Sequence, residues 1–269
     1  MYRADLHCHS RCSDGTFNPS ELLELAKEKQ LRAISITDHD TLDAYSDELF
    51  QKSQEFGVRL YVGVEFSTRH KTFPVHLLGY GVRKTPEILE FCRRHRERRS
   101  NRNRQILEKL NRLSIIVEEE ELGESKDRTV GRPHIAEMLL KKGYISSIQE
   151  AFDRYIGEGK PCFVPGESFT PEETIAIIRR GGGKALIAHP HLIGKRAVLR
   201  DLLSMDFDGI ECYYALFRGR HQEKWLRVAR EKDWLVSGGS DFHGSIKPHI
   251  SLGCSWVDEA RVKALFGEL

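Results

Sequence analysis

Short apolar segments alternate with longer amphipathic segments along most of the chain, and no other feature constrains its fold as strongly. Short apolar runs bounded by turn residues indicate buried strands, whereas apolar residues spaced three and four apart indicate helices. Strands that alternate with helices form a mainly parallel sheet covered by those helices. Strands are predicted at Tyr2–Leu6, Arg32–Ile36, Arg59–Val64, Val75–Tyr80, Lys184–Ala188, Asp208–Glu211 and Trp234–Ser237, and helices over residues 19–29, 41–56 and 171–180.

The alternation stops in the middle of the chain. The pattern from about residue 85 to residue 113 predicts one long helix, and we expect no regular strand between about residues 100 and 162. An acidic run, Glu118–Glu121, follows the long helix. We therefore predict an α/β domain over residues 1–98 and 163–269, with a small helical insertion over residues 99–162 that acts as a substrate lid.

Composition indicates a water-soluble globular protein. The 269 residues are enough for one large α/β domain with an insertion, and 39% of them are hydrophobic and 30% charged. No segment approaches the roughly 20 apolar residues that a membrane-spanning helix needs. The first ten residues, MYRADLHCHS, contain no apolar signal region. We therefore expect a cytoplasmic location.

A pair of histidines at the first predicted strand is the strongest chemical signal. His7 and His9 lie two residues apart in Asp5-Leu-His-Cys-His9. Alternate residues of an extended chain point to the same side, so both imidazoles can reach one metal ion. Asp14 follows in Ser-Asp-Gly. A single such pair could equally be surface or core polar histidines. Only further ligand-type residues at other strands can decide between these interpretations.

Further ligand-type residues lie at or near the ends of the later predicted strands. One strand is followed by Thr-Asp-His39, the next ends at Glu65, and the one after it contains His76. The carboxyl ends of barrel strands converge on one face, where active sites form. The second half of the chain adds an Ala-His-Pro and a Ser-Asp-Phe-His motif at two further strand ends. The candidate metal ligands are His7, His9, Asp14, His39, Glu65, His76, His189, Asp241 and His243.

The ligand types narrow the choice of metal. Imidazole with carboxylate and without cysteine suits Mn²⁺, Zn²⁺ or Fe²⁺ better than Mg²⁺ or Ca²⁺, which prefer oxygen ligands alone. This set is also larger than one ion needs. We therefore expect two to three divalent ions that share a bridging carboxylate, with Mn²⁺ as the first choice and Zn²⁺ or Fe²⁺ as alternatives.

In this order, H-x-H, S-D-G, T-D-H, a strand-end Glu, a later His, A-H-P and S-D-x-H resemble the polymerase-and-histidinol-phosphatase (PHP) family. The motifs run from His7 to His243 and so cover nearly the whole chain. The resemblance implies a distorted (β/α)₇ barrel, a trinuclear metal site and phosphoester hydrolysis. It also implies three ligand groups, namely His7, His9, Glu65 and Asp241; Glu65, His76 and His189; and Asp14, His39 and His243.

The insertion resembles a stand-alone branch of this family that acts on nucleoside 3′,5′-bisphosphates and on 5′ ends of short RNA. The matching motifs are Val130-Gly-Arg-Pro-His134 and Gly159-Lys-Pro161. Arg132, His134 and Lys160 would bind a second phosphate by charge-assisted hydrogen bonds. Alternatively, Arg132 and His134 cap or pack the start of a helix.

A densely basic segment, residues 93–104, lies on the predicted long helix. It is either a solvated helix face or an electrostatic guide for an anionic substrate.

These features give one functional hypothesis. A metal-bridging hydroxide held by Glu65, Asp241 and His7 would hydrolyse the 3′-phosphoester of nucleoside 3′,5′-bisphosphates, such as 3′-phosphoadenosine 5′-phosphate, and/or remove nucleotides 5′ to 3′ from short 5′-phosphorylated RNA. The expected partner is this small nucleotide or RNA substrate, with no membrane and no stable protein partner. The alternatives are a histidinol-phosphate phosphatase and a non-catalytic, metal-binding regulatory module.

Overall fold

The computed structural model describes residues 1–122, 129–166, 169–216 and 219–267. The chain forms two compact units, of which the larger consists of residues 1–92 and 169–269 and the smaller of residues 93–168. The smaller unit begins six residues earlier and ends six residues later than the helical insertion predicted from sequence. The difference arises because one long helix, α3 (Pro86–Asn111), runs through the first boundary.

The larger unit is built on seven strands that lie side by side in chain order. Most neighbouring strands are parallel, but β4 is antiparallel to both β3 and β5. The end of β7 returns to β1, where the Asp241 amide donates to the His7 carbonyl at 2.7 Å and Cys8 bridges Phe242. The sheet is therefore a nearly closed, distorted barrel, which confirms the predicted fold class. The strands are β1 (Ala4–Cys8), β2 (Ala33–Ile36), β3 (Arg59–His70), β4 (Phe73–Tyr80), β5 (Lys184–Ile187), β6 (Gly209–Tyr214) and β7 (Leu235–Gly239).

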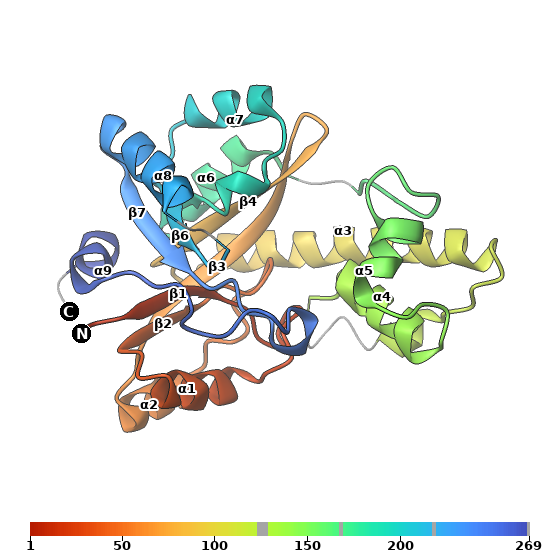
Figure 1. Cartoon of the computed structure of the whole chain (residues 1–269), viewed down its shortest axis with the longest axis horizontal. Helices are drawn as coiled ribbons and strands as arrows, with labels where there is room; N and C mark the ends of the chain where they lie inside the picture. Colours follow the sequence, from red (N-terminus) through yellow and green to blue (C-terminus); the bar gives the residue numbers. More distant parts are fainter. Residues whose placement is uncertain (123–128, 167–168, 217–218, 268–269) are drawn as a thin grey trace. The chain divides into compact units, whose positions relative to one another are not determined.

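Helices cover the outside of this barrel, with α1 and α2 on one side and α6, α7 and α8 on another (Figure 1). Several begin with residues that satisfy free amide groups of the first turn. Glu21 accepts from the Asn18 amide at 2.7 Å at the start of α1, and Thr170 and Glu173 form the same reciprocal cap on α6. The helices are α1 (Pro19–Glu28), α2 (Asp47–Phe56), α6 (Pro171–Arg180), α7 (Arg196–Leu203), α8 (Arg220–Glu231) and α9 (Glu259–Phe266).

Two details differ from the predicted elements. The third strand does not end at Glu65, because β3 continues to His70 and pairs with β4 along a long hairpin. The second helix begins at Asp47 rather than at Thr41, because the Ser46 hydroxyl accepts from the Leu49 amide and so fixes the first turn there.

Side chains of alternate strand residues enter two different clusters. Ile34 and Ile36 point outward and pack with the buried leucines of α1. Leu78 and Tyr80 pair in register with Glu65 and Gly63, and so lie on the opposite, inward face of the sheet. Their cluster contains further residues of the strands and of α9, namely Ala33, Leu186, Val262 and Leu265. Apolar side chains therefore fill much of the barrel interior below Glu65, next to the buried hydroxyl group of Ser35.

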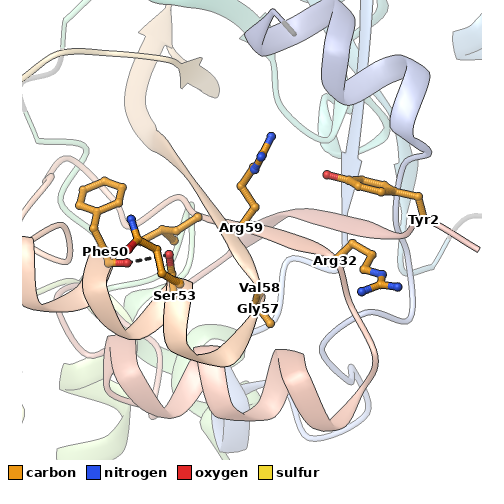
Figure 2. Close-up of a pocket in the computed structure, with 9 residues that line it drawn as sticks. Tyr2, Arg32, Phe50, Ser53, Gly57, Val58 and Arg59 are labelled. Atoms are coloured by element: carbon orange, nitrogen blue, oxygen red, sulfur yellow. Dashed lines mark hydrogen bonds between the residues drawn. The ribbon is translucent and has the colours of Figure 1, made fainter. Parts of the chain in front are cut away.

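The amino ends of the strands carry an open pocket of about 820 Å³ (Figure 2). Tyr2, Arg32 and Arg59 line it and lie before or at the start of β1, β2 and β3. None of the nine lining residues is a histidine, cysteine or carboxylate. Potential metal ligands gather instead at the other ends of these strands.

The smaller unit has its own apolar core, which includes Ile106, Leu110, Ile135, Leu139 and Ile156. Besides part of α3, it contains η1 (Glu119–Leu122), α4 (Arg132–Lys141), α5 (Ile148–Ala151) and the π-turn η2 (Phe152–Ile156). Among the residues that the structure describes, no helix of either unit has the length and apolar character needed to cross a bilayer.

The Tyr45 hydroxyl gives a test of how β2 and β3 are held together. It donates toward the carbonyls of Ile36 (2.7 Å) and Tyr61 (2.9 Å) and accepts from the Gly63 amide (2.8 Å). Because Tyr45→Phe leaves these buried groups without their partner, we expect the free energy of unfolding to fall by about 1–3 kcal/mol. Urea unfolding with an unchanged m-value measures this loss.

Tyr61→Phe is the matched control. The Tyr61 hydroxyl lies 3.5 Å from the exposed Arg59 guanidinium, so its removal should change the free energy of unfolding by no more than about 0.5 kcal/mol. Equal effects of the two substitutions would show that the Tyr45 hydroxyl does not tie the strands together.

Candidate metal centre

The first strand delivers both of its histidines to the barrel interior. His7 lies in β1 and His9 directly after it, both are fully buried, and their ring centres are 5.3 Å apart. Cys8, between them, points the other way into the outer apolar cluster, where its thiol lies 3.4 Å from the Ser35 carbonyl. The alternation expected from an extended chain therefore holds here.

The carboxylate of Glu65 is the centre of the site. Its Oε2 atom lies 3.3 Å from His7 Nε2, 3.1 Å from His9 Nε2 and 3.2 Å from His39 Nδ1. Within the described part of the chain, these three imidazole nitrogens are buried and make no hydrogen bond. Three such nitrogens around one carboxylate oxygen fit a divalent cation, which would give each of them a partner.

The other oxygen of Glu65 faces two more imidazoles. Its Oε1 atom lies 2.9 Å from His76 Nδ1 and 2.7 Å from His189 Nε2. His76 lies near the start of β4 rather than at its end. Because β4 runs against its neighbours, its first residues reach the edge at which the parallel strands finish.

A second carboxylate, Asp14, faces one further histidine and two of those already described. Asp14 Oδ1 lies 3.4 Å from His243 Nε2 and 3.7 Å from His9 Nδ1, and Asp14 Oδ2 lies 3.8 Å from His39 Nε2. The stacked rings of His9 and His243, with centres 4.1 Å apart, link this group to Glu65. His9 and His39 thus stand between two carboxylates.

Asp241 uses its two oxygens differently. Oδ1 faces His9 Nε2 at 3.3 Å and His7 Nε2 at 3.5 Å. Oδ2 accepts from the Tyr214 hydroxyl at 2.7 Å and from the Lys247 ammonium at 2.6 Å. Tyr214 and Lys247 therefore hold Oδ2, while Oδ1 remains directed at the imidazoles of His7 and His9.

Potential ligand atoms lie close enough together for a shared centre. Three sets have all their donor atoms within 4.8 Å of one another. The structure thus gathers all nine residues predicted from sequence, although His189 enters through Glu65 rather than through one of these sets. The three sets are His9, Asp14, His39 and His243; His7, His9, Glu65 and Asp241; and His39, Glu65 and His76.

Backbone strain accompanies two of these residues. His189 has a φ of 25° and Asp241 a φ of 56°, in a region that residues with a side chain rarely adopt. Such conformations cost on the order of 1–3 kcal/mol each and persist where the surroundings require them. Here these backbone conformations direct the His189 side chain toward Glu65 and the Asp241 side chain toward His9.

The electrostatics keep the carboxylates ionised. Burial would raise the pKa of Glu65, but the surrounding imidazoles, with His39 and His76 first, hold it well below its usual value. Burial also opposes ionisation of Asp241, and there Lys247 contributes most to keeping the pKa well below normal. Ionised carboxylates are the form that binds a cation.

Three further residues touch this centre and were not predicted from sequence. Tyr214 and Lys247 hold Asp241, as described above. Glu211 is fully buried and accepts hydrogen bonds from His7 Nδ1 at 2.8 Å and from the His189 amide at 2.7 Å. Glu211 ends the strand predicted at residues 208–211, so the strand-end rule that identified Glu65 would have found it too.

The predicted substrate-binding residues belong to the smaller unit. The Arg132 guanidinium lies 5.8 Å from the Phe152 ring centre and 5.5 Å from that of Phe163, and it donates to the Ile156 carbonyl at 3.2 Å. His134 is buried, and its Nδ1 accepts from the Gly131 amide at 2.9 Å. Both residues thus help to form and pack the start of α4. Lys160 is exposed in the turn before Pro161.

Comparison with known proteins decides the family. The PHP domain family matches residues 5–163. The chain belongs to the PHP domain family. The resemblance inferred from the motifs is therefore confirmed.

Two relatives match nearly the whole chain. A 5′-3′ exoribonuclease of Haemophilus influenzae is 33% identical over 260 residues, which cover 94% of this PHP protein and 92% of the relative. A 3′,5′-nucleoside bisphosphate phosphatase of Chromobacterium violaceum is 28% identical over 251 residues, or 90% and 88% of the two chains.

A solved structure from Bifidobacterium adolescentis, to which metal-dependent phosphoesterase activity is ascribed, superposes with a TM-score of 0.88 at 29% identity. The alignment covers 97% of this PHP protein and 94% of that chain. The barrel and the smaller unit thus both have counterparts in a solved PHP-like protein.

Metal removal tests whether these residues hold cations. An ion present at 100 times its dissociation constant adds about 2.7 kcal/mol to the folded state. We therefore expect chelation to lower the Tm of the wild-type protein by about 5–10 °C, and re-addition of Mn²⁺ to restore it. Thermal unfolding with and without chelator measures this difference.

His9→Ala should clearly reduce the difference between the chelated and metal-loaded Tm, because His9 takes part in two of the three ligand sets. His249→Ala removes an exposed histidine that belongs to none of these ligand sets and should leave the difference intact. A metal-dependent Tm shift as large in the His9 variant as in the wild type would contradict the assignment.

Proposed function

We propose that this PHP protein is a metal-dependent phosphoesterase that hydrolyses the 3′-phosphoester of nucleoside 3′,5′-bisphosphates and/or removes nucleotides 5′ to 3′ from short 5′-phosphorylated RNA. The observation that carries the proposal is the convergence of buried imidazoles on the Glu65 carboxylate. Relatives named as a 5′-3′ exoribonuclease and as a 3′,5′-nucleoside bisphosphate phosphatase support the choice of substrate.

The ligand groups follow the carboxylates. We assign one cation to His7, His9, Glu65 and Asp241, a second to Glu65, His76 and His189, and a third to Asp14, His39 and His243. An imidazole binds a cation through one nitrogen, so His9 and His39 each serve a single ion in this scheme. The imidazole and carboxylate donors favour Mn²⁺, with Zn²⁺ or Fe²⁺ as alternatives.

When bound, such cations supply a water that is deprotonated near neutral pH and positive charge against the phosphoryl oxygens. The chain contributes the arrangement around them. Glu65, Asp241 and His7 would hold the position from which the phosphorus is attacked. Burial lowers the pKa of Lys247, but the Asp241 carboxylate raises it by more, so that a charged ammonium remains beside Asp241.

The proposed substrates share a second phosphate, which a simple phosphate ester lacks. We assign this phosphate to Arg132, His134 and Lys160 of the smaller unit. The contacts of Arg132 with Phe152 and Phe163 restrict its side chain, and a restricted guanidinium loses less entropy when it binds a phosphate.

Nucleotides and RNA as substrates also lead us to propose a cytoplasmic location and no membrane partner.

The two alternatives have less support. A histidinol-phosphate phosphatase needs no second phosphate site, and the relatives described above carry names of nucleotide and RNA hydrolases. A non-catalytic, metal-binding regulatory module would use the same ligands, but the relatives that match nearly the whole chain are named as enzymes.

A comparison of substrates tests the function. Mn²⁺-loaded protein should hydrolyse 3′-phosphoadenosine 5′-phosphate or a 5′-phosphorylated oligoribonucleotide at least about tenfold more efficiently, in kcat/KM, than histidinol phosphate, because a charge-assisted hydrogen bond contributes about 1.5–3 kcal/mol. Phosphate release and gel analysis of RNA products measure the rates.

Asp241→Ala removes a proposed ligand and should reduce all three rates to background. Preferential hydrolysis of histidinol phosphate would overturn the substrate choice, and equal rates for wild type and Asp241→Ala would overturn the assignment of the centre.

The second-phosphate assignment is tested separately. Lys160→Ala and Arg132→Ala should raise KM for the bisphosphate about tenfold or more and leave kcat/KM for a simple phosphate ester within about threefold. Lys160 is exposed, so its loss should not lower the Tm, whereas loss of Arg132 also removes packing against Phe152. Steady-state kinetics on both substrates give the comparison.

Lys141→Ala removes an exposed lysine from the same unit and provides the control. A uniform loss on both substrates in the Lys160 variant, or an equal change in the Lys141 variant, would show that Lys160 does not bind the second phosphate.

A further inference from the structure

We propose that Glu211 is a positioning residue that fixes the orientation of two metal-facing histidines, His7 and His189, through the two oxygens of one buried carboxylate. The inference rests on the proposed metal centre, and it assigns a function to a residue that lies outside the ligand sets. Glu211 lies in β6, and its side chain is fully buried.

The contact with His7 determines which of its nitrogens can bind a cation. Glu211 Oε1 lies 2.8 Å from His7 Nδ1. An ionised carboxylate only accepts hydrogen bonds, so it requires a proton on Nδ1 of a neutral imidazole and leaves the lone pair on Nε2. That atom is the one that faces Glu65 at 3.3 Å and Asp241 at 3.5 Å. Glu211 therefore selects the ring tautomer that presents a ligand to the centre.

The contact with His189 acts on the backbone. Glu211 Oε2 accepts from the His189 amide at 2.7 Å, at the residue whose φ of 25° is strained. This bond holds the turn in the conformation that brings His189 Nε2 to 2.7 Å from Glu65 Oε1. The two histidines approach opposite oxygens of Glu65, so one carboxylate in β6 orients ligands on both sides of the central one.

A second buried carboxylate of the barrel provides a matched comparison. Asp5 is also fully buried, and it accepts from the backbone amides of His7 (3.2 Å), Ser240 (2.9 Å) and Gly253 (2.8 Å). Replacement of either carboxylate by its amide disturbs buried hydrogen bonds. Only the substitution at Glu211 alters a group that contacts an imidazole nitrogen, Nδ1 of His7.

The experiment compares Glu211→Gln with Asp5→Asn. The side-chain amide introduced by Glu211→Gln has a single acceptor oxygen, whereas both partners of Glu211 are donors. Directed at His7, its NH₂ group would donate to Nδ1 and move the ring proton to Nε2, which removes the metal-facing lone pair.

We expect the affinity of the metal-free protein for Mn²⁺ to fall about 10–100-fold in Glu211→Gln. Asp5→Asn should lower the Tm but keep the affinity within about threefold of wild type. Titration of free Mn²⁺ by electron paramagnetic resonance measures the affinity without any substrate.

A double-mutant comparison separates this role from a merely structural one. In a His7→Ala background there is no ring to orient, so the additional loss of affinity caused by Glu211→Gln should shrink to less than about fivefold, which is the part transmitted through His189. Glu211→Asp retains two acceptor oxygens and should recover part of the affinity. Equal losses with and without His7, or equal losses in Glu211→Gln and Asp5→Asn, would overturn the proposal.

The wild-type protein gives a test that does not depend on how any variant folds. Nitrogen-15 correlation spectra of the Zn²⁺-loaded chain should show His7 protonated at Nδ1 and metal-bound at Nε2, and the reverse pattern would overturn the proposal. Metal binding that depends on Glu211 in a protein without hydrolytic activity would refute the proposed function alone. Hydrolysis with an unchanged affinity in Glu211→Gln would refute the positioning role alone.

Discussion

The carboxylate of Glu65 is the interaction on which the rest of the site depends. Five imidazoles approach its two oxygens, His7, His9 and His39 on one side and His76 and His189 on the other. A buried carboxylate is costly unless its charge is compensated, and here the imidazoles hold its pKa well below the usual value. The barrel must therefore bring several strands or their following loops to one point.

The antiparallel hairpin of β3 and β4 makes this convergence possible. Glu65 lies within β3, not at its end, and the continuing strand pairs as far as His70 with Phe73. The reversed β4 then contributes His76 from its early residues, while its later residues, Leu78 and Tyr80, fill the apolar interior below. One antiparallel strand thus supplies both a ligand and part of the core beneath it.

Much of this arrangement could be predicted from the sequence because ligand-type residues follow predictable strands. The rule that the ends of parallel strands converge was sufficient for His39, His189 and Asp241. It misplaced the end of the third strand. The residues from Phe66 to His70 stay extended and pair with β4, and the sequence alone did not distinguish this continuing strand from a loop. It could not tell whether Glu211 faces a metal or a donor, since that depends on the neighbour across the sheet. At the start of α4, Arg132 and His134 make the packing and capping contacts that were predicted from sequence as the alternative to substrate binding, and their substrate role stays a proposal.

The partners of each carboxylate separate the binding groups of the centre from the orienting ones. Glu65 faces imidazole nitrogens with both oxygens, which suits a bridging ligand. Glu211 faces an N–H donor with each oxygen, which suits a residue that orients ligands. Asp241 combines the two roles, because Lys247 and Tyr214 hold Oδ2 while Oδ1 faces His9. An Asp241 held in this way can offer a cation one oxygen, and the contacts of Lys247 and Tyr214 with Oδ2 determine that this oxygen is Oδ1.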